Sequence, residues 1–397
     1  MRRQFRTVEG DPFNPAEIRQ AAERIRALGF FDDAKVDAKP GSSPDQVVVN
    51  VDVAEKPTGS ISLGASYGTA SGIGLNLGFS ETNFLGRGQG FSIDLTTGTD
   101  TKTASIGFVE PALLGRDLKL KLGANYDQSD NADARYDTRN VSVSAGLEFP
   151  IAEQSRLELR YRIFEDAVRN VEDGTAGGAA ASPLLIAEGK RGGEFGSGLG
   201  YGFSFDNRIT GLNPKNSLIF RFGQDFIGLG GDVKYIETTA LAVAETKVFH
   251  EDVTVRAIIE GGAVNSFGSY GTRVTDRYFG NSKIRGFESN GIGPRDRITD
   301  DALGGNFYAV AKFEADFPLG LPEEYGINGG VFYDIGSVWG LDSTGAVDDG
   351  MKLRSSVGVS LFWKTPIGPL RFNFSEALQK ETYDKEQKFD LTISTKF

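Results

Sequence analysis

Residues 141–149 read VSVSAGLEF, so that a polar or small side chain follows nearly every apolar one. Residues 157–163, LELRYRI, keep the same period of two and carry a charged residue at every second position. Successive side chains of a β-strand point to opposite faces of the sheet. Both stretches therefore predict strands with one apolar face and one polar, often charged, face.

The same alternation recurs from residue 60 to the C-terminus, for example in residues 60–67, 118–122 and 389–397. We count about sixteen such stretches, an even number, and many are about ten residues long. A tilted strand of that length can cross a bilayer, whereas strands of soluble proteins average about five or six residues.

The predicted connections alternate between short and long. The short ones are residues 81–88, 111–116 and 250–252 and the turn at Pro366, and the long ones are residues 164–194, 267–306 and 336–351. Outer-membrane barrels have short turns at one end and long loops at the other. We therefore predict a mainly β protein, with a 16-stranded antiparallel transmembrane β-barrel over residues 57–397. A soluble β-sandwich, whose apolar faces meet inside, is the alternative.

Residues 1–56 follow a different pattern, that of a small helix-plus-hairpin unit. Asn14 can cap a helix whose first turn contains Pro15 and Glu17, and apolar residues then follow at helical spacing. Residues 46–53 carry a valine at every second position, as a strand does. Because so short a unit has a marginal core of its own, we predict a small α/β appendage that precedes the barrel.

The composition limits the chemistry that the chain can perform. Lys and Arg number 43 and Asp and Glu number 54, and the resulting net charge of −11 argues against nucleic-acid binding. The chain has no cysteine and one histidine, His250, which lies in a predicted turn. Thiolate and multi-histidine metal sites are therefore excluded, and a Ser-His-Asp relay would have to use this one residue. We predict no catalytic residues, no metal site and no cofactor, and we expect the protein not to be an enzyme.

Two further patterns have some features of ligand sites. Glycines recur at every second position in residues 196–202, but no strand-loop-helix context makes them a phosphate loop, and small residues on one face of a strand can relieve crowding. Two acidic clusters offer oxygen ligands without the spacing of an EF-hand. We predict solvated outer loops there, with divalent ions as the alternative: Asp127, Asp130 and Asp133, and Asp296, Asp300 and Asp301.

The predicted loop of residues 267–306 is long enough to suggest a function of its own. It contains the stretch SKIRGFE, residues 282–288, in which Arg285 is flanked by apolar residues and glycine. If this loop folds into the wet interior of the barrel, its guanidinium needs an inward carboxylate. Strand parity points Glu314 and Asp334 inward. The alternative is an ordinary exposed arginine.

Several motifs carry a resemblance to a known family. The chain resembles the BamA family of outer-membrane protein assembly factors, within the outer-membrane insertase superfamily, over essentially its whole length. Ile284, Arg285, Gly286 and Phe287 match the signature of that family's sixth external loop. Further similar motifs are KPTGS at residues 56–60, NFLGRG at 83–88, FYDIGSVW at 332–339, GFF at 29–31 and PDQV at 44–47.

The resemblance implies both an architecture and a function. Residues 1–56 would be part of the C-terminal POTRA module in the periplasm, in a chain that lacks most of the POTRA array, and residues 57–397 the barrel in the bacterial outer membrane. The loop arginine would contact Glu314 and Asp334. The function would be assembly and insertion of β-barrel proteins, by lateral opening and strand templating where the first and last strands meet. We place this seam at the following residues: Ser60, Ile61, Ser62, Leu63, Gly64, Phe389, Leu391, Ile393 and Phe397.

The implied partners are unfolded outer-membrane β-barrel clients, outer-membrane lipids and the accessory lipoproteins of the BAM complex. We expect lipoprotein binding to be lost or weakened in a chain without the full POTRA array. Two-partner-secretion and autotransporter-assembly relatives, and a passive outer-membrane pore, are the alternative functions. A pore would leave the Ile-Arg-Gly-Phe loop and the POTRA-like unit unexplained.

Overall fold

The computed structural model describes the chain apart from residues 1–3, 6, 8, 44–45, 69–71, 131–133, 176–177, 211–214, 270, 281–282, 343–346, 366–367 and 397. Several residues singled out from the sequence lie outside this part: Pro44, Asp45, Asp133, Ser282, Pro366 and Phe397.

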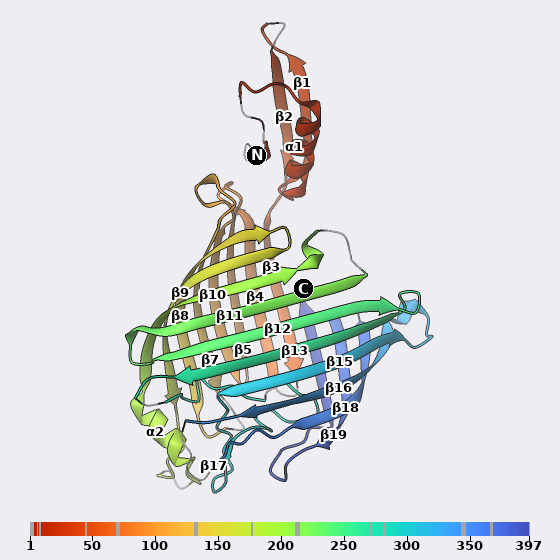
Figure 1. Ribbon diagram of the computed structural model, residues 1–397. Helices are drawn as coiled ribbons and strands as arrows, with labels where there is room; N and C mark the ends of the chain where they lie inside the picture. The colour runs from red at the N-terminus through yellow and green to blue at the C-terminus, as the bar shows by residue number, and fades with distance from the viewer. Residues whose placement is uncertain are drawn as a thin grey trace.

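The N-terminal unit consists of helix α1 (Pro15–Ala27) packed on a hairpin of β1 (Phe31–Pro40) and β2 (Val47–Glu55). Asn14 caps the helix, because its side-chain oxygen accepts a hydrogen bond of 3.0 Å from the backbone N–H of Ala16. The apolar face of the helix and one residue of β1 form the small core: Ile18, Ala21, Ala22, Ile25 and Ala34. Figure 1 shows this unit projecting from one end of the barrel.

In the described part of the chain, sixteen antiparallel strands form one closed barrel, as the sequence predicts. Each strand pairs with the next barrel strand along the chain, and the last pairs with the first. The strands are β3 (Gly59–Gly68), β4 (Gly72–Phe84), β5 (Gln89–Gly98), β6 (Thr101–Glu110), β7 (Lys119–Asp130), β8 (Asp137–Ala152), β9 (Ser155–Arg169), β10 (Gly193–Asp206), β11 (Asn216–Gly231), β12 (Tyr235–Val248), β13 (Val253–Ser266), β15 (Phe307–Pro318), β16 (Ile327–Trp339), β18 (Arg354–Thr365), β19 (Gly368–Gln379) and β20 (Phe389–Lys396).

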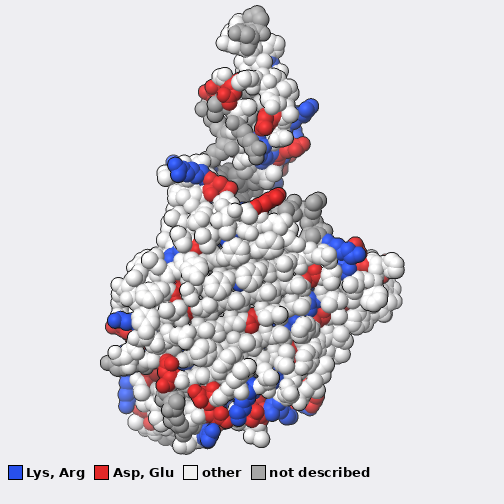
Figure 2. Space-filling view, in the orientation of Figure 1, with Lys and Arg blue, Asp and Glu red and all other residues white. Residues whose placement is uncertain are grey.

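The apolar face of each alternating strand lies on the outside of the barrel. Val143 is 57% exposed, whereas its neighbour Ser142 is buried on the inner side. On the face seen in Figure 2, the barrel wall is mostly uncharged with a few scattered charged side chains, and Lys, Arg, Asp and Glu gather at its two ends. This arrangement excludes a β-sandwich, in which the apolar faces of two sheets would meet inside.

The connections differ in length between the two ends of the barrel. Short turns lie at the end that carries the N-terminal unit, and they include the short helices η2 (Leu113–Gly115), η3 (Asn207–Thr210) and η4 (Glu323–Tyr325). The long loops at the other end comprise residues 170–192, 267–306 and 340–353. The first is shorter than predicted because β9 continues to Arg169. These loops contain α2 (Pro183–Arg191) and a two-stranded sheet of β14 (Arg295–Asp296) and β17 (Val347–Asp348).

Among the described residues, neither helix combines the length and the apolar character needed to cross a membrane. That finding concerns helices alone and has no bearing on crossing by strands.

The repeated glycines of β10 make room for an ion pair that crosses the strand. Arg160 on β9, Gly200 on β10 and Asp225 on β11 lie side by side in register. The Arg160 guanidinium reaches over the glycine and donates from Nε to Asp225 Oδ1 at 2.8 Å. A Cβ atom added at Gly200 would lie 1.9 Å from that oxygen. A glycine is therefore needed at position 200, because any larger residue would collide with the ion pair between Arg160 and Asp225.

We expect Gly200→Ala to destabilise the barrel by about 1–3 kcal/mol, because the added methyl group must displace Asp225 from Arg160. The measurement is the free energy of unfolding in urea, in detergent micelles. Gly202→Ala is the matched control: its Cβ would lie 3.1 Å from Arg160 Nη1, which is not one of the two nitrogens bonded to Asp225, and the substitution should cost far less. Equal losses from the two substitutions would contradict this account.

Candidate functional site: the loop anchor and the barrel seam

The loop of residues 267–306 is anchored to the inner wall of the barrel by Arg285. Its Nε donates to Asp334 Oδ2 at 2.8 Å and its Nη2 to Asp334 Oδ1 at 2.6 Å. The backbone N–H of the same residue donates to Asp334 Oδ2 at 3.0 Å. Its Nη1 lies 2.6 Å from Glu314 Oε1 as an ion pair. The structure thus brings together the arginine and the two carboxylates selected by strand parity.

The two carboxylates have different surroundings. Asp334, on β16, is fully buried, and among the described residues its charged partner is Arg285. Glu314, on β15, also lies 3.1 Å from Arg256 and 3.3 Å from Arg371. The aspartate therefore depends on the loop arginine, whereas the glutamate retains two other cations without it.

The anchor keeps its positive charge although it is largely buried. Burial opposes the charged form, but the hydrogen bonds and charge of Asp334 and the charge of Glu314 outweigh it and hold the pKa of the Arg285 guanidinium above its ordinary value. The guanidinium carbon also lies 3.7 Å from the centre of the Phe332 ring, which adds a cation–π contact.

The residues on either side of Arg285 fix the loop by packing. Ile284 and Phe287 are buried, and both join one apolar cluster with Tyr308 of β15. Gly286 has a φ of 92°, and a Cβ added there would lie 3.2 Å from Ser356 on the wall. Each residue of the Ile-Arg-Gly-Phe signature therefore has a distinct role in holding the loop against the wall.

The anchored loop also pairs with the segment that leads into β20. Phe287 forms an isolated antiparallel bridge with Glu386, and the carbonyl of Gly286 accepts from the N–H of Gln387 at 3.0 Å. The N–H of Glu288 donates to the carbonyl of Lys385, also at 3.0 Å. Sequence reasoning missed this contact, since backbone pairing between two loops leaves no side-chain pattern.

Among the described residues, the seam between β20 and β3 has five register pairs and lies further along β3 than we predicted. In the described residues, the pairing runs from Thr392 opposite Gly68 to Lys396 opposite Gly64. Of the predicted seam residues, Gly64 and Ile393 lie within it, and Phe397 lies outside the described residues. In the described part of the chain, the others pair with the neighbouring strand on their own side: Ser60, Ile61, Ser62 and Leu63 with β4, and Phe389 and Leu391 with β19.

The last strand is also held weakly on its other side. In the described residues β20 forms five register pairs with β19 and five with β3, whereas β3 forms ten with β4. Because the backbone hydrogen bonds of a ladder grow in number with its register pairs, β20 is attached through fewer described interactions than β3.

Two members of the second acidic cluster, Asp296 and Asp301, are buried in a cap, which corrects our prediction of a solvated loop there, whereas Asp300 is exposed. Asp296 accepts from the hydroxyl of Ser182 at 2.7 Å, and Asp301 accepts from the backbone N–H of Ser182 at 2.6 Å. These bonds hold the start of α2 against the long loop. Nearby, buried Arg277 pairs with Glu188 of α2 at 2.8 Å. The acidic side chains therefore bind the cap together, and within the described residues no group of His, Asp and Glu is arranged to hold a metal ion.

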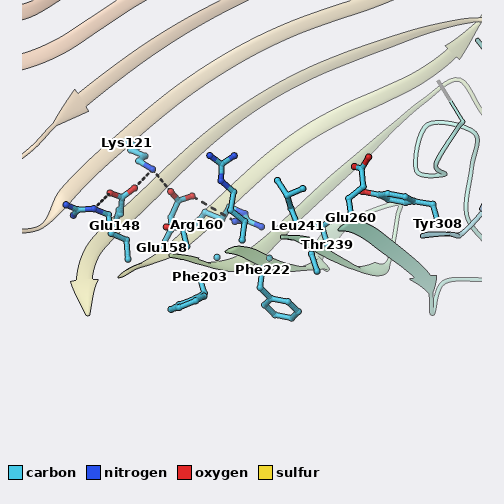
Figure 3. Close-up of a pocket in the computed structure, with 16 residues that line it drawn as sticks. Lys121, Glu148, Glu158, Arg160, Phe203, Phe222, Thr239, Leu241, Glu260 and Tyr308 are labelled. Atoms are coloured by element: carbon cyan, nitrogen blue, oxygen red, sulfur yellow. Dashed lines mark hydrogen bonds and ion pairs between the residues drawn. The ribbon is translucent and has the colours of Figure 1, made fainter. Parts of the chain in front are cut away.

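The inner wall also carries a charged cavity of about 470 Å³. Lys121 Nζ lies 2.5 Å from Glu148 Oε2 and 2.6 Å from Glu158 Oε2. Figure 3 shows Lys121 between these two carboxylates, with Arg160 next to Glu158. The lining holds four basic and three acidic side chains, and Lys121, Arg156 and Arg160 pair with Glu148 and Glu158. His250 is not among the residues that line this cavity; it lies in the turn between β12 and β13, with a φ of 60°.

Comparison with known proteins agrees with this architecture. A model described as "Omp85 superfamily domain" matches residues 83–397, and a POTRA model described as "Surface antigen variable number repeat" matches residues 1–56. The outer membrane protein assembly factor BamA of Neorickettsia risticii is 30% identical over 401 residues, which cover 100% of this chain and 53% of the relative. Its counterpart from Neisseria meningitidis serogroup B is 24% identical, covering 100% and 54%.

A solved structure shows the same fold. The crystal structure of BamA from Haemophilus ducreyi lacking POTRA domains 1–3 superimposes with a TM-score of 0.84 at 23% identity, covering 100% of this chain and 81% of that one. The chain spans about half the length of the curated relatives it matches. Since the Omp85 match covers most of the chain and includes the anchored loop and the last strand, the chain belongs to the Omp85 superfamily.

Proposed function

We propose that this chain assembles β-barrel proteins and inserts them into the bacterial outer membrane, by opening laterally between β3 and β20. The observation that carries the proposal is the seam, where the described residues form five register pairs between β3 and β20, against ten between β3 and β4. The names of the two BamA relatives, outer membrane protein assembly factors, support the same function.

The chemistry of the proposed step is backbone hydrogen bonding. When the seam opens, the edge of β3 exposes unpaired N–H and C=O groups, which an incoming strand can satisfy by β-augmentation. A client strand that enters hydrocarbon alone leaves each such group unsatisfied at a cost of several kcal/mol. The open edge therefore lowers the barrier to insertion without any covalent step, and we propose that the protein is not an enzyme.

The same proposal assigns locations and partners. The barrel would lie in the outer membrane, where its uncharged outer band meets lipid, and the N-terminal unit would lie in the periplasm. Unfolded barrel clients and outer-membrane lipids would be its direct partners, together with the accessory lipoproteins of the BAM complex.

Reconstitution in liposomes tests the function. An unfolded barrel client should fold faster in vesicles that contain the full chain than in vesicles that contain a pore-forming barrel of similar size. Client folding is followed by its heat-modifiable migration on a gel. Equal rates in the two preparations, together with ion conductance through the chain, would favour the passive pore and overturn the proposal.

A further inference from the structure

Two successive turns at the end of the barrel near the N-terminal unit share one sequence and one conformation. They are the two Leu-Gly-Arg turns, residues 85–87 between β4 and β5 and residues 114–116 between β6 and β7. In each, the N–H of the glycine donates to the carbonyl three residues earlier, at 2.8 and 2.9 Å, and the N–H of the arginine does the same, at 3.2 and 3.1 Å.

The leucine of each turn has an unfavourable backbone conformation and no packing that would explain it. Leu85 and Leu114 have φ values of 54° and 55°, in the left-handed region that glycine and asparagine occupy far more readily than leucine. Their side chains are 74% and 87% exposed. A bulky apolar residue is thus displayed where a small polar one would suit the isolated chain better, which indicates a contact outside the chain.

The surroundings of the two leucines indicate what makes that contact. The Phe84 ring stacks on Phe91 at 5.1 Å, and Phe91 meets Phe79 of the outer band at 6.3 Å, so an apolar path leads from the barrel wall to Leu85. Beside the leucines, Arg87 and Arg116 are exposed and form no ion pair with any described residue. Apolar tips with free guanidinium groups match a lipid headgroup layer, since phosphate binds arginine and acyl chains receive leucine.

A third turn at the same end favours lipid over a single protein partner. Phe249, between β12 and β13, is 76% exposed and also has a positive φ, 50°. The strands β12 and β13 lie far from β4–β7 in the order of the barrel. One docked protein would have to reach both places, whereas a bilayer surrounds the barrel.

We propose that the two Leu-Gly-Arg turns dock into the lipid headgroup layer on the side of the membrane that faces the N-terminal unit. The leucine side chains insert toward the acyl chains and the arginines bind lipid phosphate. The turns thereby fix the depth in the membrane of β4–β7, the strands that follow β3 on one side of the seam. This inference rests on the proposed membrane location of the barrel.

Spin labels measure the depth directly, because the chain has no cysteine and each engineered cysteine is unique. Nitroxides are attached at Leu85→Cys or Leu114→Cys in the full chain, in vesicles of phosphatidylethanolamine and phosphatidylglycerol. Collisions with oxygen, which concentrates in lipid, are compared with collisions with a water-soluble nickel chelate. The labels at both turns should favour oxygen severalfold over the label at Asp117→Cys, an exposed polar position beside the second turn.

A label at Leu75→Cys, on the outer band of β4, separates the two hypotheses. If it favours oxygen while both turn labels match Asp117→Cys, the docking proposal is overturned and the membrane location stands. If the Leu75→Cys label is water-accessible, the membrane location itself fails and the docking proposal fails with it.

Substitutions at the turns test the two contacts separately. Leu85→Asn with Leu114→Asn suits the left-handed backbone and should leave barrel folding in detergent micelles unchanged or improved, while it shifts a label at Thr82→Cys, an exposed position beside the first turn, toward water. Arg87→Gln with Arg116→Gln should shift the same label in the same direction. No shift in either double variant would overturn the corresponding contact.

Discussion

A disulfide between Ser66→Cys and Ser394→Cys is expected to abolish client insertion, and its reduction should restore the activity. These two residues lie opposite each other in the middle of the short pairing between β3 and β20. A covalent link there prevents the strands from separating, so that β3 never exposes its unpaired backbone groups. The assay is client folding in liposomes, measured with the oxidised and the reduced protein.

The matched control is a second pair of serines, in the neighbouring strand pair β3 and β4. Ser60 and Ser80 face each other between β3 and β4, so Ser60→Cys with Ser80→Cys joins two strands that need not part. This variant should form a disulfide and keep its activity. If the oxidised seam variant inserts clients as fast as this control, lateral opening is refuted, whatever the state of the remaining barrel.

Removal of the loop anchor by Arg285→Ala is expected to destabilise the protein by about 3–5 kcal/mol, because it leaves the buried Asp334 carboxylate without its charged partner. Client insertion should fall in parallel, since the loop also holds the segment before β20. The measurements are the free energy of unfolding in micelles and the rate of client folding. Arg297→Ala is the control: this arginine, in the same loop, is largely exposed and its pair with Asp348 should contribute at most about 1 kcal/mol.

Double substitutions should show which carboxylate depends on the arginine. Arg285→Ala with Asp334→Asn is expected to cost clearly less than the sum of the single changes, by roughly 1–3 kcal/mol, because the uncompensated charge disappears. Arg285→Ala with Glu314→Gln should deviate less from additivity, since Arg256 and Arg371 still face Glu314. Strict additivity in both cycles would contradict the pairing.

The barrel and its anchor could largely be predicted from the sequence, because both follow from local alternation. The period of two assigns each strand residue to a face, which is enough to place Glu314 and Asp334 on the inside. The length of the loop of residues 267–306 follows from where the alternation stops, at Ser266, and resumes, at Phe307.

The seam could not be predicted in the same way, for a geometric reason. Moving one strand along its neighbour by an even number of residues leaves every side chain on its original face, so alternation cannot distinguish such registers. The register between the first and last strands is the sum of the offsets around the whole barrel, which fixes its shear. We therefore placed the pairing near Ser60, whereas in the residues that the structure describes it begins at Gly64.

The buried cap shows a second limit of sequence reasoning. Asp296, Asp301 and Arg277 look like solvated loop residues, since charged side chains are seldom fully buried. Their partners Ser182 and Glu188 lie about a hundred residues away in the chain, and no local pattern connects them. Only the three-dimensional arrangement shows that these charges stabilise the cap from within.

The pairing of residues 286–288 with residues 385–387 implies an order of events during the protein's own folding. The loop cannot reach its final position until β15, β16 and the segment before β20 have all been made, because it contacts each of them. Closing contacts between such distant parts of a chain is slow, since the entropic cost must be met before the contacts form. The Arg285 anchor is therefore expected to form late in folding, after the segment that leads into β20 is in place. In a chain that ends before β20, we expect this loop to stay mobile and open to proteases.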